Sequence, residues 1–63
     1  MTQETFYRVL KIYERMLNCK RLIEDYQNQL DLPFGKEYKD RLRTQIAKRR
    51  TEIRTLQKEI EML

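Results

Sequence analysis

Apolar side chains recur every seven residues in this chain, and the repeat is interrupted at one place near the middle. In the first half, two apolar rows stand three residues apart, one made of Val9, Met16, Ile23 and Leu30 and the other of Ile12, Cys19 and Tyr26. Spacings of three and four residues bring both rows to one side of an α-helix, whereas a β-strand would need a spacing of two. The pattern therefore predicts a helix over residues 3–30.

The second half has the same repeat. Its two apolar rows are made of Ile46, Ile53 and Ile60 and of Leu42, Leu56 and Leu63. Lys39 and Arg49 are polar residues at positions where the repeat would place an apolar side chain. A second helix is therefore predicted over residues 36–62.

The only proline and the only glycine, Pro33 and Gly35, fall between these two helices. Proline lacks an amide donor and disfavours helical geometry at the residue before it, and glycine is common in turns. A turn is therefore predicted over residues 31–35. Two heptad helices joined by so short a turn run antiparallel. The predicted fold class is all-α, with residues 1–63 forming a single antiparallel two-helix hairpin that has a heptad seam.

Charged residues beside the seam favour one register of the two helices. In an antiparallel pair, this register brings Arg8 opposite Glu59 and Arg15 opposite Glu52, with residue numbers that add up to 67 in both cases. The same register leaves a short turn between the helices and brings Val9 opposite Leu56. A register displaced by one heptad, with Val9 against Leu63 instead, is the alternative. Exposed ion pairs stabilise a fold by about 0–1 kcal/mol each, so we expect these pairs to select the register more than to hold the fold.

Arg49 stands opposite Met16 in this register, at a seam position where leucine would pack. Two interpretations follow. The long side chain reaches outward to solvent, or it fixes the register or the oligomeric state by pairing with an acid such as Glu52. Cys19, the only cysteine, is expected to be a small buried apolar residue of the seam, with an intermolecular disulfide across a symmetric dimer as the alternative.

A second set of apolar residues lies on the first helix beside the seam. Their spacing of three and four residues places them in one row, which we call the apolar stripe: Phe6, Leu10, Tyr13 and Leu17. Because a single seam between two helices buries little apolar surface, we expect the hairpin to associate with another molecule. The preferred interpretation of the stripe is the interface of a homodimer that forms a four-helix bundle. A groove for a different partner and simple exposure are the alternatives.

The positive charge of the chain belongs to its second half. Residues 1–32 hold five Lys or Arg and five Asp or Glu, whereas residues 36–63 hold nine and five. Many of these cations follow one flank of the second helix, which we call the basic flank: Lys36, Lys39, Arg43, Arg50 and Arg54. Such a flank is typical of a solvated face, of a site for an acidic protein surface, or of a phosphate-backbone contact.

The residue inventory argues against catalysis. The chain has no serine, no histidine and one cysteine, so it lacks Ser/His triads, Cys/His dyads and multi-Cys or Cys/His zinc sites. No catalytic residue, cofactor, metal or small-molecule substrate is predicted. Apolar residues never run longer than two in a row, so we expect neither a secretory signal nor a membrane role. The lone cysteine favours a reducing, cytoplasmic setting.

These observations favour a small non-enzymatic interaction protein. We expect it to self-associate and to dock on a macromolecule with an acidic surface, which it regulates or inhibits. The basic flank would supply the charge for this contact and the apolar stripe the apolar anchors. One alternative is a hairpin dimer that binds RNA or DNA, and another is a structural coiled-coil piece of a larger assembly. The residues match no family motif.

Overall fold

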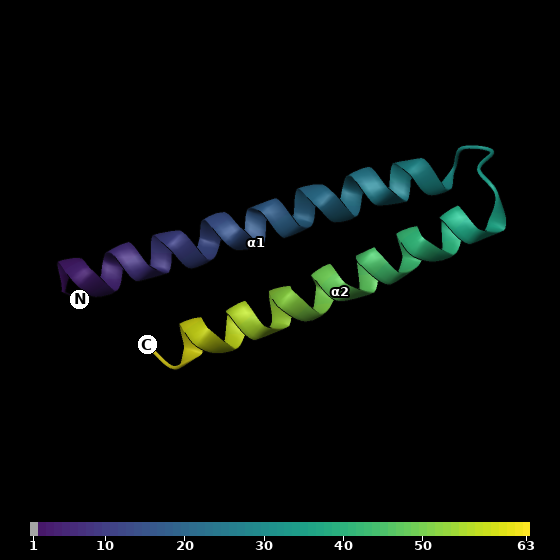
Figure 1. Ribbon diagram of the computed structural model, residues 1–63. Helices are drawn as coiled ribbons and strands as arrows, with labels where there is room; N and C mark the ends of the chain where they lie inside the picture. Colours follow the sequence, from purple (N-terminus) through teal and green to yellow (C-terminus); the bar gives the residue numbers. More distant parts are fainter. Residues whose placement is uncertain (1) are drawn as a thin grey trace.

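The computed structural model describes residues 2–63 as a helical hairpin. Helix α1 spans Gln3–Leu30 and helix α2 spans Lys36–Glu61. The two helices lie antiparallel and pack against each other, so both chain ends are at the same end of the molecule (Figure 1). The Cα trace extends over 50 × 15 × 10 Å. The predicted all-α hairpin is confirmed, and α2 ends one residue earlier than expected.

Thr2 fixes the start of α1. Its side-chain oxygen accepts a hydrogen bond from the amide of Thr5 at 3.2 Å, and the two hydroxyl groups lie 2.9 Å apart. This arrangement satisfies one of the amide donors that the first turn of a helix leaves unpaired. Glu4 adds a negative charge in the same turn, where the helix dipole favours it.

The chain bends at Pro33, whereas Gly35 has an ordinary backbone conformation. The amides of Asp31 and Leu32 still bond to carbonyls of the last turn of α1, and the amide of Phe34 donates to the carbonyl of Leu32 at 2.8 Å, which closes a tight turn around Pro33. Gly35 is the N-cap of α2, with a φ of −67° that other residues also adopt, and no side-chain bond caps this helix.

Aromatic packing stabilises the turn from the side of α2. The rings of Phe34 and Tyr38 are tilted by 56° with their centroids 4.6 Å apart, a favourable aromatic geometry. The hydroxyl group of Tyr38 donates to Oε1 of Gln29 on α1 at 2.7 Å. The turn is therefore tied to both helices by side chains that flank it.

One of the two ion pairs that define the predicted register forms, but the packing across the seam is displaced from that register by about one heptad. Val9 lines a hollow with Ile60 and Leu63 instead of meeting Leu56, and Met16 lines one with Gln57. The thiol of Cys19 forms a hydrogen bond with Glu52, whereas the predicted register sets Cys19 opposite Ile46.

Nη2 of Arg15 lies 3.6 Å from Oε1 of Glu52, and the numbers of Gln29 and Tyr38 also add up to 67. The second predicted ion pair, between Arg8 and Glu59, does not form within residues 2–63. Both residues are exposed there and line one hollow at the terminal end of the hairpin, where water screens their attraction.

The core is narrow because it consists of one seam. Among residues 2–63 the buried hydrophobic side chains all belong to the predicted heptad rows: Met16, Cys19, Leu42, Ile46 and Leu56. Other residues of these rows, such as Val9 and Ile60, are half-buried. Two helices leave the outer edges of every layer open to solvent, so residues close to the seam remain accessible for binding.

Candidate interaction surfaces

The seam divides the hairpin surface into two long sides. On the paired side, Arg15 faces Glu52 and Gln29 faces Tyr38. On the unpaired side, Gln27 of α1 faces Arg43 and Arg50 of α2, as shown by the hollow that these three residues share. The lining of that hollow contains no acidic residue. The two sides therefore differ in whether a cation of one helix pairs with an acid of the other: Arg15 does so on the paired side, and on the unpaired side no ion pair between the helices forms within residues 2–63.

Three hollows follow the unpaired side along its length. Two lie toward the terminal end, and both are lined by Tyr13 and Ile60. The third lies toward the turn, and its lining is Gln27, Leu30, Arg43, Ile46, Ala47 and Arg50. Each hollow is lined by apolar residues of the seam and by residues at the heptad positions next to the seam. The unpaired side is therefore a discontinuous groove that is basic toward the turn, whereas toward the terminal end apolar residues line it together with Gln57 and Glu61.

The structure places most of the predicted basic flank at the surface of α2. Lys36, Arg43, Arg50 and Arg54 are exposed, whereas Lys39 is half-buried beside the seam. Nη1 of Arg43 pairs with Oδ1 of Asp40 at 3.1 Å. Lys36, Arg50 and Arg54 form no ion pair with any residue from 2 to 63. These three are therefore the exposed members of the flank whose charge no acid of the described residues uses.

All four residues of the apolar stripe are exposed. Phe6, Leu10, Tyr13 and Leu17 keep between 44% and 55% of their surface accessible to solvent. Water-exposed apolar groups that adjoin one another are characteristic of association surfaces. Tyr13 also lines two of the hollows on the unpaired side, so the stripe and the groove are continuous.

A cluster of charged side chains lies within the seam near the middle of the hairpin. Nη1 of Arg49 lies 2.9 Å from Oε2 of Glu52, and Arg15 contacts the other oxygen of the same carboxylate. The guanidinium group of Arg49 thus pairs with Glu52 instead of turning to solvent, as the second interpretation of this residue predicted. Nε of Arg49 is buried and has no hydrogen-bond partner within residues 2–63, so the cluster is incompletely satisfied.

Contacts in and around the cluster shift the pKa values of Glu52, Arg49 and Cys19. A hydrogen bond from Arg49 lowers the pKa of Glu52, and a hydrogen bond with the thiol of Cys19 lowers it further. The bond to Glu52 also raises the pKa of Arg49. Burial raises the pKa of Cys19, and its contact with Glu52 acts in the same direction. The thiol is therefore neutral at physiological pH and poorly reactive.

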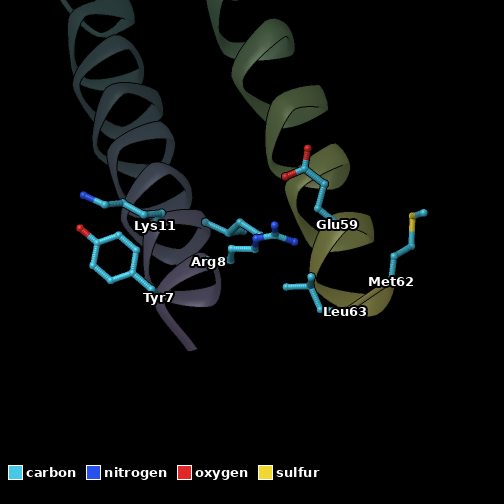
Figure 2. A pocket seen from close by; sticks show the side chains of 7 residues that line it. Tyr7, Arg8, Lys11, Glu59, Met62 and Leu63 are labelled. Carbon is cyan, nitrogen blue, oxygen red and sulfur yellow. The ribbon is translucent and has the colours of Figure 1, made fainter. Parts of the chain in front are cut away.

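A further hollow lies on the paired side at the terminal end. Figure 2 shows Arg8 reaching from α1 toward α2, where Glu59 and Leu63 stand on the opposite wall. The hollow is mostly apolar, and Lys11 lies with its ammonium group 5.4 Å from the centroid of the Tyr7 ring. Lys11 also pairs with Glu14 at 3.8 Å. At this end, Lys11 therefore interacts with residues of its own helix, which neutralises part of its charge.

Sequence reasoning missed two features of these surfaces. The first is Ala47, whose small side chain leaves open the hollow between Arg43 and Arg50. Its position three and four residues from these two arginines was a signal available in the sequence. The second is the contact of Cys19 with Glu52, which the predicted register does not give, because Arg49 opposite Met16 would set Cys19 opposite Ile46.

Comparison of the chain with protein-family models, with curated proteins and with solved structures finds no match. Neither of the two described helices has a stretch that is long and apolar enough to cross a membrane. The function must therefore be inferred from the surfaces of the hairpin themselves.

Proposed function

We propose that this chain is a non-enzymatic interaction module that self-associates through the apolar stripe and docks through the basic flank on a macromolecule with an acidic surface. The observation that carries the proposal is the separation of the two sides of the hairpin. On the paired side a cation of α1 pairs with an acid of α2, as Arg15 does with Glu52, whereas Arg50 and Arg54 lack ion-pair partners among residues 2–63.

The accessible area supports self-association. The hairpin exposes 5362 Å², whereas a globular monomer of 7.9 kDa exposes about 4,400 Å². The excess of about 950 Å² is close to the roughly 800 Å² that each partner contributes to a standard protein interface. A second copy that covers the apolar stripe would bring the area per chain to the value of a globular protein.

Symmetry favours the stripe over the flank as the self-contact. In a two-fold dimer each patch meets its own copy. Two apolar stripes complement each other in this arrangement, whereas two basic flanks would bring Arg50 and Arg54 toward like charges. The two hairpins then form a four-helix bundle in which the α1 helices meet and the basic flanks stay accessible.

An acidic partner is the occupant that best matches the basic flank. Exposed cations next to apolar side chains suit a protein surface that carries carboxylates around apolar groups. Docking of such a module covers a functional surface of the partner, so regulation or inhibition is the biological effect we propose. Docking of a nucleic acid is the competing outcome of the same experiment.

The test compares two charge reversals of equal size. Arg50→Glu with Arg54→Glu alters the basic flank, and Arg41→Glu with Lys48→Glu alters exposed positions elsewhere on α2. Each pair changes the net charge from +4 to 0, so any difference between them comes from position. We expect proteins from a nuclease-treated lysate of the native cell to be retained by the wild type and the control pair and lost by the flank pair.

Two outcomes would contradict the proposal. Equal retention by both variants would mean that the flank is not the docking surface. Retention that disappears on nuclease treatment, together with duplex binding that weakens steeply between about 50 and 200 mM salt, would assign the flank to nucleic acid instead.

A further inference from the structure

The hollow toward the turn has a composition that specifies a partner more closely than charge alone. It has a volume of about 240 Å³ and lies between Arg43 and Arg50. Ile46, Leu30 and Ala47 supply its apolar surface, of which Ile46 is buried and Leu30 half-buried. Ala47 is exposed and too small to fill the space. The hollow is therefore a recess over apolar side chains that Arg43 and Arg50 border along α2, with the guanidinium group of Arg43 paired to Asp40.

The spacing along α2 defines the complementary surface. Arg43 and Arg50 are seven residues apart, which is about 10.5 Å along a helix at 1.5 Å per residue. Ala47 stands between them, four residues after the first and three before the second. A partner helix has the same rise, so its matching side chains recur at the same spacing. The complement is a carboxylate, an apolar side chain three or four residues later, and a second carboxylate at the seventh residue.

The electrostatics of the hollow favour an anionic occupant. Arg50 forms no ion pair within residues 2–63, and the pair of Arg43 with Asp40 is exposed on both partners, so a carboxylate of another molecule can replace it at little cost. The lining holds two cations and no acid. In the observed register, Lys20 of α1 shares the layer of Arg50 and adds to the positive potential.

We propose that this hollow anchors an acidic amphipathic helix of the partner protein, which inserts one apolar side chain between the two arginines. This inference rests on the proposed function and names the class of partner. The arginines hold the carboxylates that flank the inserted side chain, and the recess over Ile46 and Ala47 removes that side chain from water. A phosphate backbone would pair with the arginines but would leave the recess empty.

Two peptides of about three heptads test the apolar anchor. The first carries Glu, Leu and Glu at the spacing described above, and the second replaces each Leu of this pattern with Gln and keeps the same charge. Binding to the full chain is measured by fluorescence anisotropy at about 150 mM salt. We expect the Leu peptide to bind about tenfold tighter, because one apolar side chain becomes buried.

Substitution in the protein locates the effect. Ala47→Gln fills the recess with a polar side chain of high helix propensity, so we expect it to remove the difference between the two peptides. Thr44→Gln is the matched control, because Thr44 is an exposed residue of α2 that does not line the hollow. The control is expected to keep the tenfold preference.

The outcomes separate the inference from the proposed function. Equal affinity for both peptides, lost on Arg50→Glu with Arg54→Glu, would overturn the apolar anchor and leave the acidic docking surface intact. Binding of neither peptide would overturn both. A short DNA duplex that binds more tightly than the Leu peptide, with an affinity unchanged by Ala47→Gln, would overturn the protein-helix assignment in favour of nucleic acid.

Discussion

The two long sides of the hairpin contain the same kinds of charged residue and use them differently. On the paired side, Arg15 and Arg49 share the carboxylate of Glu52; the contact of Arg15 joins the two helices, whereas Arg49 and Glu52 both belong to α2. On the unpaired side, Arg43 and Arg50 border a hollow that no acid lines. The difference shows that the heptad position of a cation decides whether an acid of the other helix can reach it.

The two sides also differ in how far the apolar residues next to the seam are exposed. Seam residues are shared by both sides, and Leu56 is the most deeply buried of them, with 1% of its surface exposed. The apolar stripe continues the unpaired side outward over α1, where nothing within residues 2–63 covers it. Substitutions can therefore alter the seam, the apolar stripe and the cluster of Arg15, Arg49 and Glu52 separately.

The largest effect is expected from the common seam. Leu56→Ala leaves a cavity in the layer that both sides share, and we expect the free energy of unfolding to fall by about 2–5 kcal/mol. Urea denaturation followed by far-ultraviolet circular dichroism measures this loss. Lys48→Ala, at an exposed position of the same helix, should change the stability by no more than about 0.5 kcal/mol. Similar effects of both substitutions would show that the two sides do not share one core.

The next largest effect concerns the apolar stripe. Leu10→Asp with Leu17→Asp places like charges against each other across the two-fold axis, and we expect the dimer to weaken about a hundredfold. Sedimentation equilibrium measures the dissociation constant. Asn18→Asp with Asn28→Asp adds the same charge at exposed positions of α1 and should leave dimerisation nearly unchanged. A wild-type chain that sediments as a monomer at all accessible concentrations would contradict the dimer.

A smaller effect is expected from acid, and it reports on the paired side. The pKa of Glu52 is lowered in the folded state, chiefly by the hydrogen bond from Arg49. The folded state therefore binds this proton less readily than the unfolded chain, whose glutamate pKa is about 4.3. The contribution to stability is complete above about pH 5 and is lost as the pH falls through the lowered pKa. Thermal unfolding between about pH 6 and pH 3 measures the loss.

Arg49→Leu is the control for this pH dependence, because it removes the main cause of the lowered pKa. The variant should lose less stability on acidification than the wild type. Leucine at this seam position replaces the buried Nε that lacks a partner with an apolar side chain, and we expect this gain to exceed the loss of the bond to Glu52, so that stability at neutral pH rises. An acid response as steep as that of the wild type would assign the pH dependence to other carboxylates.

The smallest effect is expected at the turn, which joins the two sides without belonging to either. Gly35 is the N-cap of α2 and has no side-chain cap, and a Cβ added there would have no atom within 4 Å. Gly35→Asp supplies the missing acceptor and restricts the unfolded chain, so stability should rise by about 0.5–1 kcal/mol. Chemical denaturation measures the gain, and Gly35→Ala separates the cap from the chain restriction. A loss of stability would show that the turn needs the glycine.

Much of the fold follows from the heptad pattern and the turn. The spacing of Val9, Met16, Ile23 and Leu30 defines one helix face, and Pro33 ends that helix, so the two-helix arrangement is a local consequence of the residues. The register was predicted from two charge pairs, of which Arg15 with Glu52 forms and Arg8 with Glu59 does not. Pairs near a chain end have solvent on more sides, and this difference in environment is not encoded in the spacing of charges.

The candidate site was predicted less completely. The exposed positions of Arg50 and Arg54 and of the apolar stripe agree with the sequence pattern, but Lys39 lies half-buried beside the seam. The role of Ala47 depends on the space between side chains of two helices. A sequence pattern gives the direction of each side chain on its own helix and does not give the volume left between helices.

The sequence by itself determined that the chain forms two amphipathic helices, that they fold back at residues 31–35, and that the excess positive charge lies on the second helix, because periodicity and composition act locally. Only the tertiary structure decided that Arg49 shares Glu52 with Arg15 in the seam and that Ala47 opens a recess between two arginines. Both features depend on the relative position of side chains from separate helices, which packing across the seam sets.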